Sequence, residues 1–225
     1  MGWWKTRWRL GYRFKKLTQR AYKEAGVKQP IGIVNVPLWP KSFMDNFKDI
    51  SFEKTHDFNF IGCINICPII KENRKWVIPF AKKHFTERSY LRLNSNEDLE
   101  VHKKIGDYDH TFSYKKKRFV DKYMNLCMKR CAFDKDYYGV MCSSEFTLCP
   151  AGDCPDSDRF FETIMSKSIP ILEKQEHCGH NKKLENIGYK FYLLGDDYVY
   201  RQDWVDYNYD LFLKTHTLFG KQKRI

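Results

Sequence analysis

The stretch LCPAGDCPDSDRFFETIMSKSIPIL, residues Leu148–Leu172, carries the strongest fold signal in this chain of 225 residues. An apolar segment leads through a Gly-containing loop into a helical pattern over 157–167, and a second apolar segment follows at 168–172. This order indicates two parallel strands, because the helix returns the chain to the edge where the next strand must begin. Arg159 and Glu162 lie in the first turns of the helix, where packing does not require them, so we expect them to bind a ligand.

Strands and helices alternate on both sides of this stretch as well. The other predicted strands are 57–66, 89–94, 146–149 and 188–194, and the other predicted helices are 72–85, 115–133 and 203–219. Pro79 lies inside the first of these helices, so we expect a kink or a split there. The alternation predicts an α/β fold, a Rossmann-like parallel sheet with helices on both faces.

The composition fits one large folded domain with an anionic partner. Hydrophobic residues make up 42% of the chain and aromatic residues 16%, and the net charge is +12. Such a charge favours nucleic acid, a phosphorylated small molecule or an anionic membrane. Eight cysteines are present without a secretory signal or a long apolar run, so we expect free thiols and a cytoplasmic location. Their spacings differ from those of paired zinc ligands, and we expect no metal site.

Residues 3–24 have the pattern of a basic amphipathic helix, and we divide the chain into this helical segment, 1–30, and a Rossmann-like domain, 31–225, whose ligand the following residues indicate. One face of the helix is cationic and carries Lys5, Arg9, Arg13, Lys16, Arg20 and Lys23. Two interpretations remain open. The helix lies on an anionic membrane as a peripheral contact, or it packs its aromatic side on the domain.

The loop at 150–157 occupies the position where open α/β sheets bind ligands, beyond the carboxyl end of a strand. Gly152 and Asp153 lie in this loop, and Ser157 can begin the helix, whose free N–H groups favour a phosphate. Arg159 would add a charge-assisted bond, and Glu162 could accept both hydroxyls of a ribose. These groups together suit a nucleotide-sugar diphosphate. The competing interpretation is an exposed ion pair between Arg159 and Glu162.

The segment FTLCPAGDCPDSDRFFETIMSKSIPIL, 146–172, resembles the donor-binding segment of exostosin-type glycosyltransferases. In that family a strand and loop lead into Ser-x-Arg-x-x-Glu, which Ser157, Arg159 and Glu162 match. The upstream segment FNFIGCINI, with Arg74 after it, is similar to the first strand, loop and basic helix of the same half, and this adds Gly62 and Arg74 to the expected donor site. The chain departs from the family at Lys167-Ser168, where a small residue, often Gly, is usual before the Pro-containing strand.

The resemblance implies a fold related to the C-terminal half of two-domain (GT-B) glycosyltransferases. It implies a hexosyl- or pentosyltransferase that moves a sugar from a UDP-sugar, with xylose among the candidates, to a hydroxyl of a glycan or glycoprotein. We expect an inverting reaction with UDP-sugar as substrate, no obligatory cofactor and no metal. Few residues precede the strand at 57–66, so we expect that an N-terminal domain is minimal or missing, or that the sequence is a portion of a longer protein. A bacterial or viral member without a membrane anchor would fit the free cysteines.

An inverting transfer needs a general base, and the densest acid–base cluster is GDYDH. Asp107, Asp109 and His110 are therefore the candidate bases, although Gly106 and Asp107 also suit a simple turn.

Two other functions compete with this prediction. A fucosyltransferase-like enzyme using a GDP-sugar would carry an acidic residue in the same helix. A basic nucleic-acid-binding or membrane-surface scaffold without catalysis would explain the charge. The positive residues are dispersed and no RNA- or DNA-binding motif is present, so we expect no nucleic-acid partner.

Overall fold

The computed structural model describes residues 15–29, 37–64, 68–93, 104–105, 108–109, 111–112, 133–152, 157–174 and 180–219. Among them, six strands form one sheet in the order β5-β2-β1-β6-β7-β8, and every neighbouring pair in it is parallel. The strands are β1 (His56–Gly62), β2 (Tyr90–Leu93), β5 (Thr111–Phe112), β6 (Ser144–Leu148), β7 (Ile169–Leu172) and β8 (Tyr192–Leu193). A separate antiparallel pair joins β3 (Lys104–Ile105) to β4 (Tyr108–Asp109).

The strand order places a topological switch point between β1 and β6. From β1 the chain builds outward through β2 to β5, and from β6 it builds outward in the opposite direction through β7 to β8. This is the doubly wound Rossmann order, in which ligands bind outside the carboxyl ends of the strands where the direction of winding reverses. Here those ends are Gly62 of β1 and Leu148 of β6.

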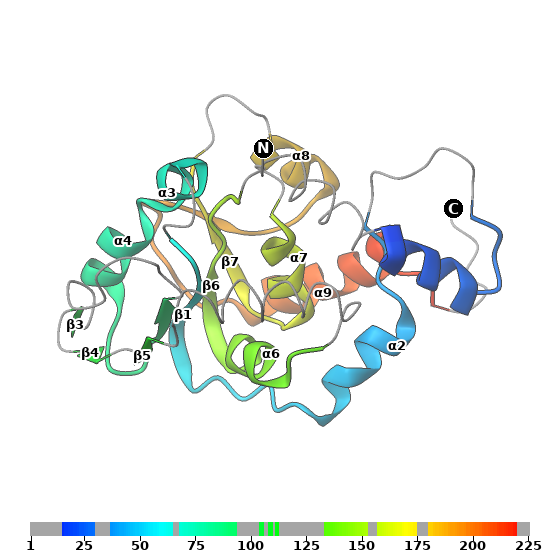
Figure 1. Cartoon of the computed structure of the whole chain (residues 1–225), viewed down its shortest axis with the longest axis horizontal. Helices are drawn as coiled ribbons and strands as arrows, with labels where there is room; N and C mark the ends of the chain where they lie inside the picture. The colour runs from blue at the N-terminus through cyan, green and yellow to red at the C-terminus, as the bar shows by residue number, and fades with distance from the viewer. Residues whose placement is uncertain are drawn as a thin grey trace.

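Helices cover both faces of the sheet, as the sequence predicted (Figure 1). One face packs against α4 (Val77–His84), and its apolar cluster includes Phe60, Phe80 and Phe146. The other face packs against α6, α7 and α9 together with the N-terminal α2 and η1. Their bounds are α2 (Lys41–Met44), η1 (Asp45–Asp49), α6 (Lys135–Cys142), α7 (Asp158–Met165) and α9 (Gln202–His216); α3 (Pro68–Arg74) and α8 (His180–Ile187) complete the described helices.

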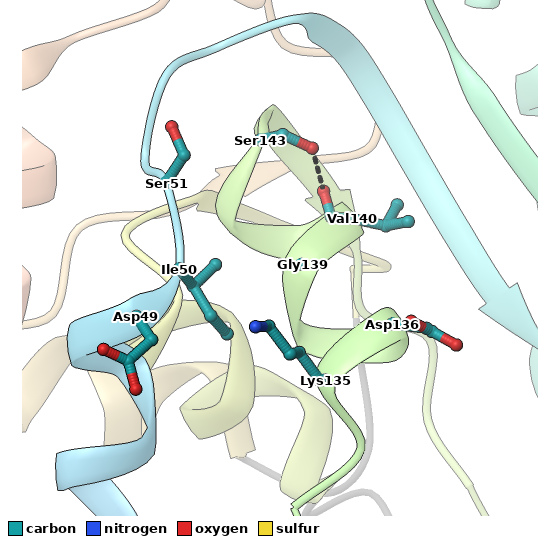
Figure 2. Close-up of a pocket in the computed structure, with 8 residues that line it drawn as sticks. All are labelled: Asp49, Ile50, Ser51, Lys135, Asp136, Gly139, Val140 and Ser143. Carbon is teal, nitrogen blue, oxygen red and sulfur yellow. Dashed lines mark hydrogen bonds between the residues drawn. The ribbon is translucent and has the colours of Figure 1, made fainter.

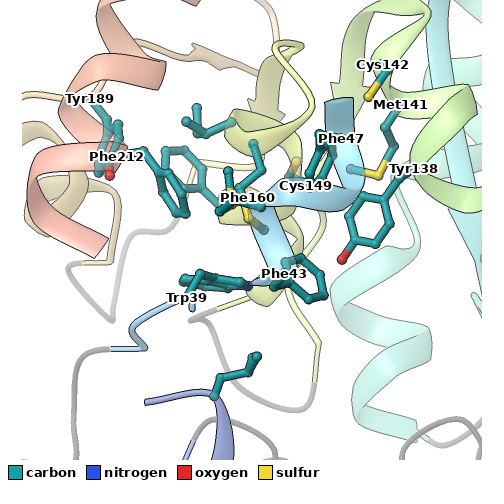
Figure 3. Close-up of a cluster of buried hydrophobic side chains, with 14 of the residues drawn as sticks. Trp39, Phe43, Phe47, Tyr138, Met141, Cys142, Cys149, Phe160, Tyr189 and Phe212 are labelled. Carbon is teal, nitrogen blue, oxygen red and sulfur yellow. The ribbon is translucent and has the colours of Figure 1, made fainter. Parts of the chain in front are cut away.

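The second cluster joins distant parts of the chain into one core (Figure 3). Trp39, from the segment before α2, packs against Phe212 of α9 with ring centroids 5.4 Å apart. Leu17, in the helix over residues 15–24, belongs to the same cluster and is buried. The described part of the N-terminal helix therefore packs its apolar side on the domain, which favours packing over the membrane interpretation for this part.

A chain of polar side chains is buried between the three central strands. The Asn59 amide donates to Thr147 Oγ1 at 2.6 Å, and Thr147 Oγ1 lies 2.8 Å from Ser168 Oγ. These three residues come from β1, from β6 and from the residue before β7. Because each of these three side chains has a hydrogen-bond partner, this polar network favours the observed register of the strands over a shifted one.

The predicted elements differ from the observed ones in several places. The predicted helix at 72–85 is split into α3 and α4 at residues 75–76, while Pro79 fits the first turn of α4, where its missing N–H costs no hydrogen bond. Neither α6 nor α8 was predicted, and the strand predicted at 188–194 is reduced to Tyr192–Leu193. The helix predicted at 115–133 lies almost wholly outside the described residues.

Candidate active site

The N-terminal end of α7 faces the switch point. Ser157 is the N-cap residue and has the extended backbone of a cap, but its side chain makes no capping hydrogen bond. The first N–H groups of a helix have no partner within the helix, and they carry its positive end. Since α7 follows β6, this end of the helix lies at the carboxyl edge of the sheet and can receive an anion.

Arg159 extends from the first turn of α7 towards the end of β1. Its guanidinium carbon lies 4.9 Å from the centre of the Phe60 ring, a cation–π contact across the switch point. A Cβ on Gly62 would be 3.0 Å from Arg159 Nη2, so the glycine makes room for the guanidinium. Nη1 is buried and has no hydrogen-bond partner. A buried guanidinium N–H without a partner is costly, and an anion bound here would satisfy it.

Glu162 lies one turn deeper in α7 and is only 6% exposed. Its carboxylate accepts hydrogen bonds from the hydroxyls of two consecutive residues of α6, Tyr137 on Oε2 at 2.8 Å and Tyr138 on Oε1 at 3.2 Å. Burial raises the pKa of Tyr137 above its usual range, and the Glu162 carboxylate adds to that shift, so Tyr137 keeps its proton and remains a donor. The sequence analysis did not identify these tyrosines.

The loop after β6 is held by side chains from two other elements. Arg74 Nε donates to the Ala151 carbonyl at 3.1 Å and its Nη1 to the Cys63 carbonyl at 2.6 Å, so Arg74 joins the ends of β1 and β6. Asn73 Nδ2 donates to the Gly152 carbonyl at 2.6 Å. From the end of β7, Glu173 Oε1 accepts the Ala151 N–H at 3.0 Å. Arg74, which was predicted as a donor-site residue, therefore donates hydrogen bonds to backbone carbonyls and positions the loop.

The comparison with known families is decisive at this point. Residues 61–186, more than half of the chain, match the model of the Exostosin GT47 domain. The chain belongs to the exostosin family of glycosyltransferases. A comparison with curated proteins found no match. The matched range contains the last two residues of β1, all of β6, α7 and β7, and with them Arg159 and Glu162.

Family membership makes the chain a glycosyltransferase, and the family implies a nucleotide-sugar donor and a glycan acceptor. The parallel sheet with helices on both faces agrees with a GT-B glycosyltransferase domain. Within the exostosin domain, the structure brings Gly62, Ser157, Arg159 and Glu162 to the same end of β1 and β6, while Asp153 lies outside the described residues. No helix in the described part of the chain is long and apolar enough to cross a membrane.

The candidate bases are not joined to this site by the described contacts. Asp109 ends β4, where its partner across the antiparallel pair is Lys104, and Asp107 and His110 lie outside the described residues.

A groove of about 440 Å³ lies on the outer side of α6, between α6 and η1 (Figure 2). It is open, and its lining consists of Asp49, Ile50, Ser51, Lys135, Asp136, Gly139, Val140 and Ser143. None of these residues belongs to the predicted donor site, and the groove contains acidic as well as basic side chains. Neither Arg159, whose Nη1 is buried near the switch point, nor the buried Glu162 lines this groove.

Proposed function

We propose that this exostosin-family protein transfers a hexose or pentose, with xylose among the candidates, from a UDP-sugar to a glycan hydroxyl with inversion of configuration. The diphosphate binds at the start of α7 and on Arg159, and the ribose hydroxyls bind to the Glu162 carboxylate. The observation that carries the proposal is the position of Arg159, whose buried Nη1 without a partner lies at the switch point beside Gly62. A diphosphate is the anion that both the fold and the family favour there.

The chemistry assigned to these residues is stabilisation of the leaving group. In a single displacement the acceptor oxygen attacks the anomeric carbon, a general base takes its proton, and the bond from that carbon to the diphosphate oxygen breaks. The departing UDP gains negative charge, which Arg159 and the N–H groups at the start of α7 would stabilise. The general base is proposed among Asp107, Asp109 and His110, the acid–base cluster of the sequence.

Isothermal titration calorimetry with UDP, GDP and ADP tests the nucleotide site. We expect UDP to bind most tightly, and Arg159→Gln and Glu162→Ala each to weaken UDP binding roughly tenfold or more. Arg201→Gln is the matched control, because Arg201 is an exposed arginine at the start of α9 whose ion pair is with Asp203. UDP binding that survives Glu162→Ala unchanged would reject the ribose assignment. A preference for GDP would support the fucosyltransferase-like alternative, and no nucleotide binding would favour a scaffold.

The transfer reaction is tested by UDP release from UDP-xylose, UDP-galactose, UDP-glucuronate and UDP-arabinose, with a panel of glycan acceptors. The configuration of the product at the anomeric carbon, read by NMR, decides between inversion and retention. Metal independence needs its own test, because the chain contains Asp-x-Asp triplets at 107–109, 134–136 and 156–158. We expect full activity in excess EDTA, and restoration by Mn²⁺ of an activity lost in EDTA would overturn that part of the proposal.

A further inference from the structure

Two consecutive tyrosines at the start of α6 contact both oxygens of one buried carboxylate. Tyr137 donates to Oε2 and Tyr138 to Oε1 of Glu162, and the two rings meet edge to face with centroids 5.1 Å apart. Consecutive side chains of a helix point about 100° apart, so both can reach one carboxylate only if it lies between them. The contact therefore fixes the position of the Glu162 side chain between α6 and α7.

The tyrosines are themselves held in place. Asp134 caps α6 by accepting the Tyr137 N–H at 3.1 Å, which sets where the helix begins. Tyr138 is 2% exposed and its ring stacks on Phe133, with centroids 4.6 Å apart and planes 12° from parallel. Phe47 of η1 meets the same ring edge to face at 5.1 Å, so the N-terminal segment supports this end of the site (Figure 3).

A carboxylate in this position needs such support to bind a ligand well. Burying a charged group is costly unless hydrogen bonds compensate for the lost water, and the two hydroxyls provide them. A carboxylate can accept about four hydrogen bonds in all, so the two tyrosine bonds are compatible with additional bonds to ribose hydroxyls. Fixing the carboxylate before the ligand arrives lowers the entropy cost of binding.

We propose that Tyr137 and Tyr138 are positioning residues for ribose recognition, which orient the Glu162 carboxylate so that the site distinguishes a ribonucleotide from a deoxyribonucleotide. The proposal rests on the donor site proposed above. It extends that site to a pair of residues on α6 that do not belong to the Ser-x-Arg-x-x-Glu pattern. It also assigns a role to η1, which packs on Tyr138 from the N-terminal side.

The test compares the affinities of the full chain for UDP, 2′-deoxy-UDP and 3′-deoxy-UDP by calorimetry. We expect the wild-type chain to bind UDP roughly tenfold more tightly than either deoxy analogue. In Tyr137→Phe and Tyr138→Phe the UDP affinity should fall roughly three- to tenfold while the affinity for the deoxy analogues changes little, so that the preference shrinks. In a Glu162→Gln background neither tyrosine substitution should change the preference further.

Tyr189→Phe is the matched control, because Tyr189 is a buried tyrosine whose hydroxyl lies 2.9 Å from His216 Nδ1, away from Glu162. Each substitution retains its ring, and thermal unfolding confirms that the variants are folded. A loss of affinity shared equally by UDP and both deoxy analogues would show a merely structural role and overturn the proposal. An unchanged preference in both tyrosine variants would overturn it too, while leaving the donor site intact. Failure of the wild-type chain to bind UDP would reject the donor site and this proposal with it.

Discussion

The Arg159 guanidinium lies close to the position that a Cβ on Gly62 would occupy, across the switch point of the sheet. A Cβ added to Gly62 would lie 3.0 Å from Arg159 Nη2, nearer than most side-chain contacts, and 3.4 Å from Nη1. Gly62 ends β1, and Arg159 belongs to the helix that follows β6. Because Gly62 has no side chain, the end of β1 leaves space for the Arg159 guanidinium, which comes from the other half of the sheet.

Gly62→Ala should consequently impair donor binding more than folding. The new methyl group would displace the guanidinium, because its nearest contact is the end of a flexible side chain that can move, although it would also lie 3.3 Å from the buried Phe60 ring. Gly62 is not among the described residues with positive φ, so alanine fits its backbone. We expect the affinity for UDP to fall roughly five- to tenfold, with a change of less than about 1 kcal/mol in the free energy of unfolding.

Gly139→Ala is the control for this substitution. Gly139 lies in α6, and a Cβ there would meet nothing within 4 Å. Alanine is the better helix former, so the free energy of unfolding should rise by about 0.5–1 kcal/mol without a change in UDP affinity. Calorimetric titration and urea unfolding of both variants check the pair. A Gly62→Ala chain that binds UDP as the wild type does would show that the position of Arg159 is unimportant for the donor.

The sequence predicted the central part of the fold because its signals there are local. The segments that became β1, β6 and β7 are apolar, and α7 follows a Gly-containing loop, so the pattern indicated the parallel sheet directly. It failed at α6, whose sequence KDYYGVMC contains Gly139 and residues with low helix propensity. That helix depends on its Asp134 cap and on burial of Tyr138, Met141 and Cys142. A closer look at the cap residue, three positions before Tyr137, would have indicated a helix start.

The candidate site was predictable only as far as it is contiguous in the chain. Arg159 and Glu162 follow a recognisable loop, and the structure places both in α7 near the switch point; that they bind a ligand stays a prediction. Tyr137 and Tyr138 reach Glu162 from 25 and 24 positions away, and no spacing rule connects such residues. Lys167, in the pair Lys167-Ser168 where the resembling family usually has a small residue, often Gly, has a φ of 54°, in the left-handed region that favours glycine.

Lys54 should be important for stability but not for donor binding. Its ammonium donates to three backbone carbonyls, those of Cys142 at 2.8 Å, Ser144 at 3.0 Å and Lys167 at 2.7 Å. The Cys142 carbonyl is at the last residue of α6 and the Lys167 carbonyl is two residues beyond α7, so the cation lies near the C-terminal ends of two helices, where the helix dipoles favour it. We expect Lys54→Met to lower the free energy of unfolding by about 2–4 kcal/mol, measured in urea. The affinity for UDP should be unchanged in the same variant, and a large loss of affinity would contradict a purely structural role.

The same lysine should give a pH dependence of known sign. Burial lowers the pKa of Lys54 from 10.5 to about 8. Between pH 8 and pH 10.5, Lys54 still holds its proton in the unfolded chain but has released it in the folded chain. The contribution of Lys54 to the free energy of unfolding therefore rises with pH over this range. The difference in unfolding free energy between the wild type and Lys54→Met should therefore widen by up to about 3 kcal/mol from pH 8 to pH 10.5. A difference that narrows over this range would contradict the lowered pKa.

The buried cysteine thiols should give a pH dependence of stability opposite in sign to that of Lys54. Burial raises the pKa of Cys63 and Cys149 to about 12 and that of Cys142 to about 11, from 9.0, and all three side chains are buried. Above pH 9 the unfolded chain releases these protons while the folded chain retains them, so the stability that the thiols contribute below pH 9 is lost as the pH rises towards 11.

Because the thiolate is the nucleophile, the folded chain should also protect these cysteines from iodoacetamide at neutral pH. Mass spectrometry of the alkylated peptides, with and without urea, measures this protection for each residue. We expect modification of Cys63, Cys142 and Cys149 only when the chain unfolds. In the structure α7 packs against the end of β6, and Cys149 Sγ lies 3.2 Å from Thr163 Oγ1. If Cys149 were alkylated as fast in the folded chain as in urea, the end of β6 would be open to the reagent. That result would contradict this packing.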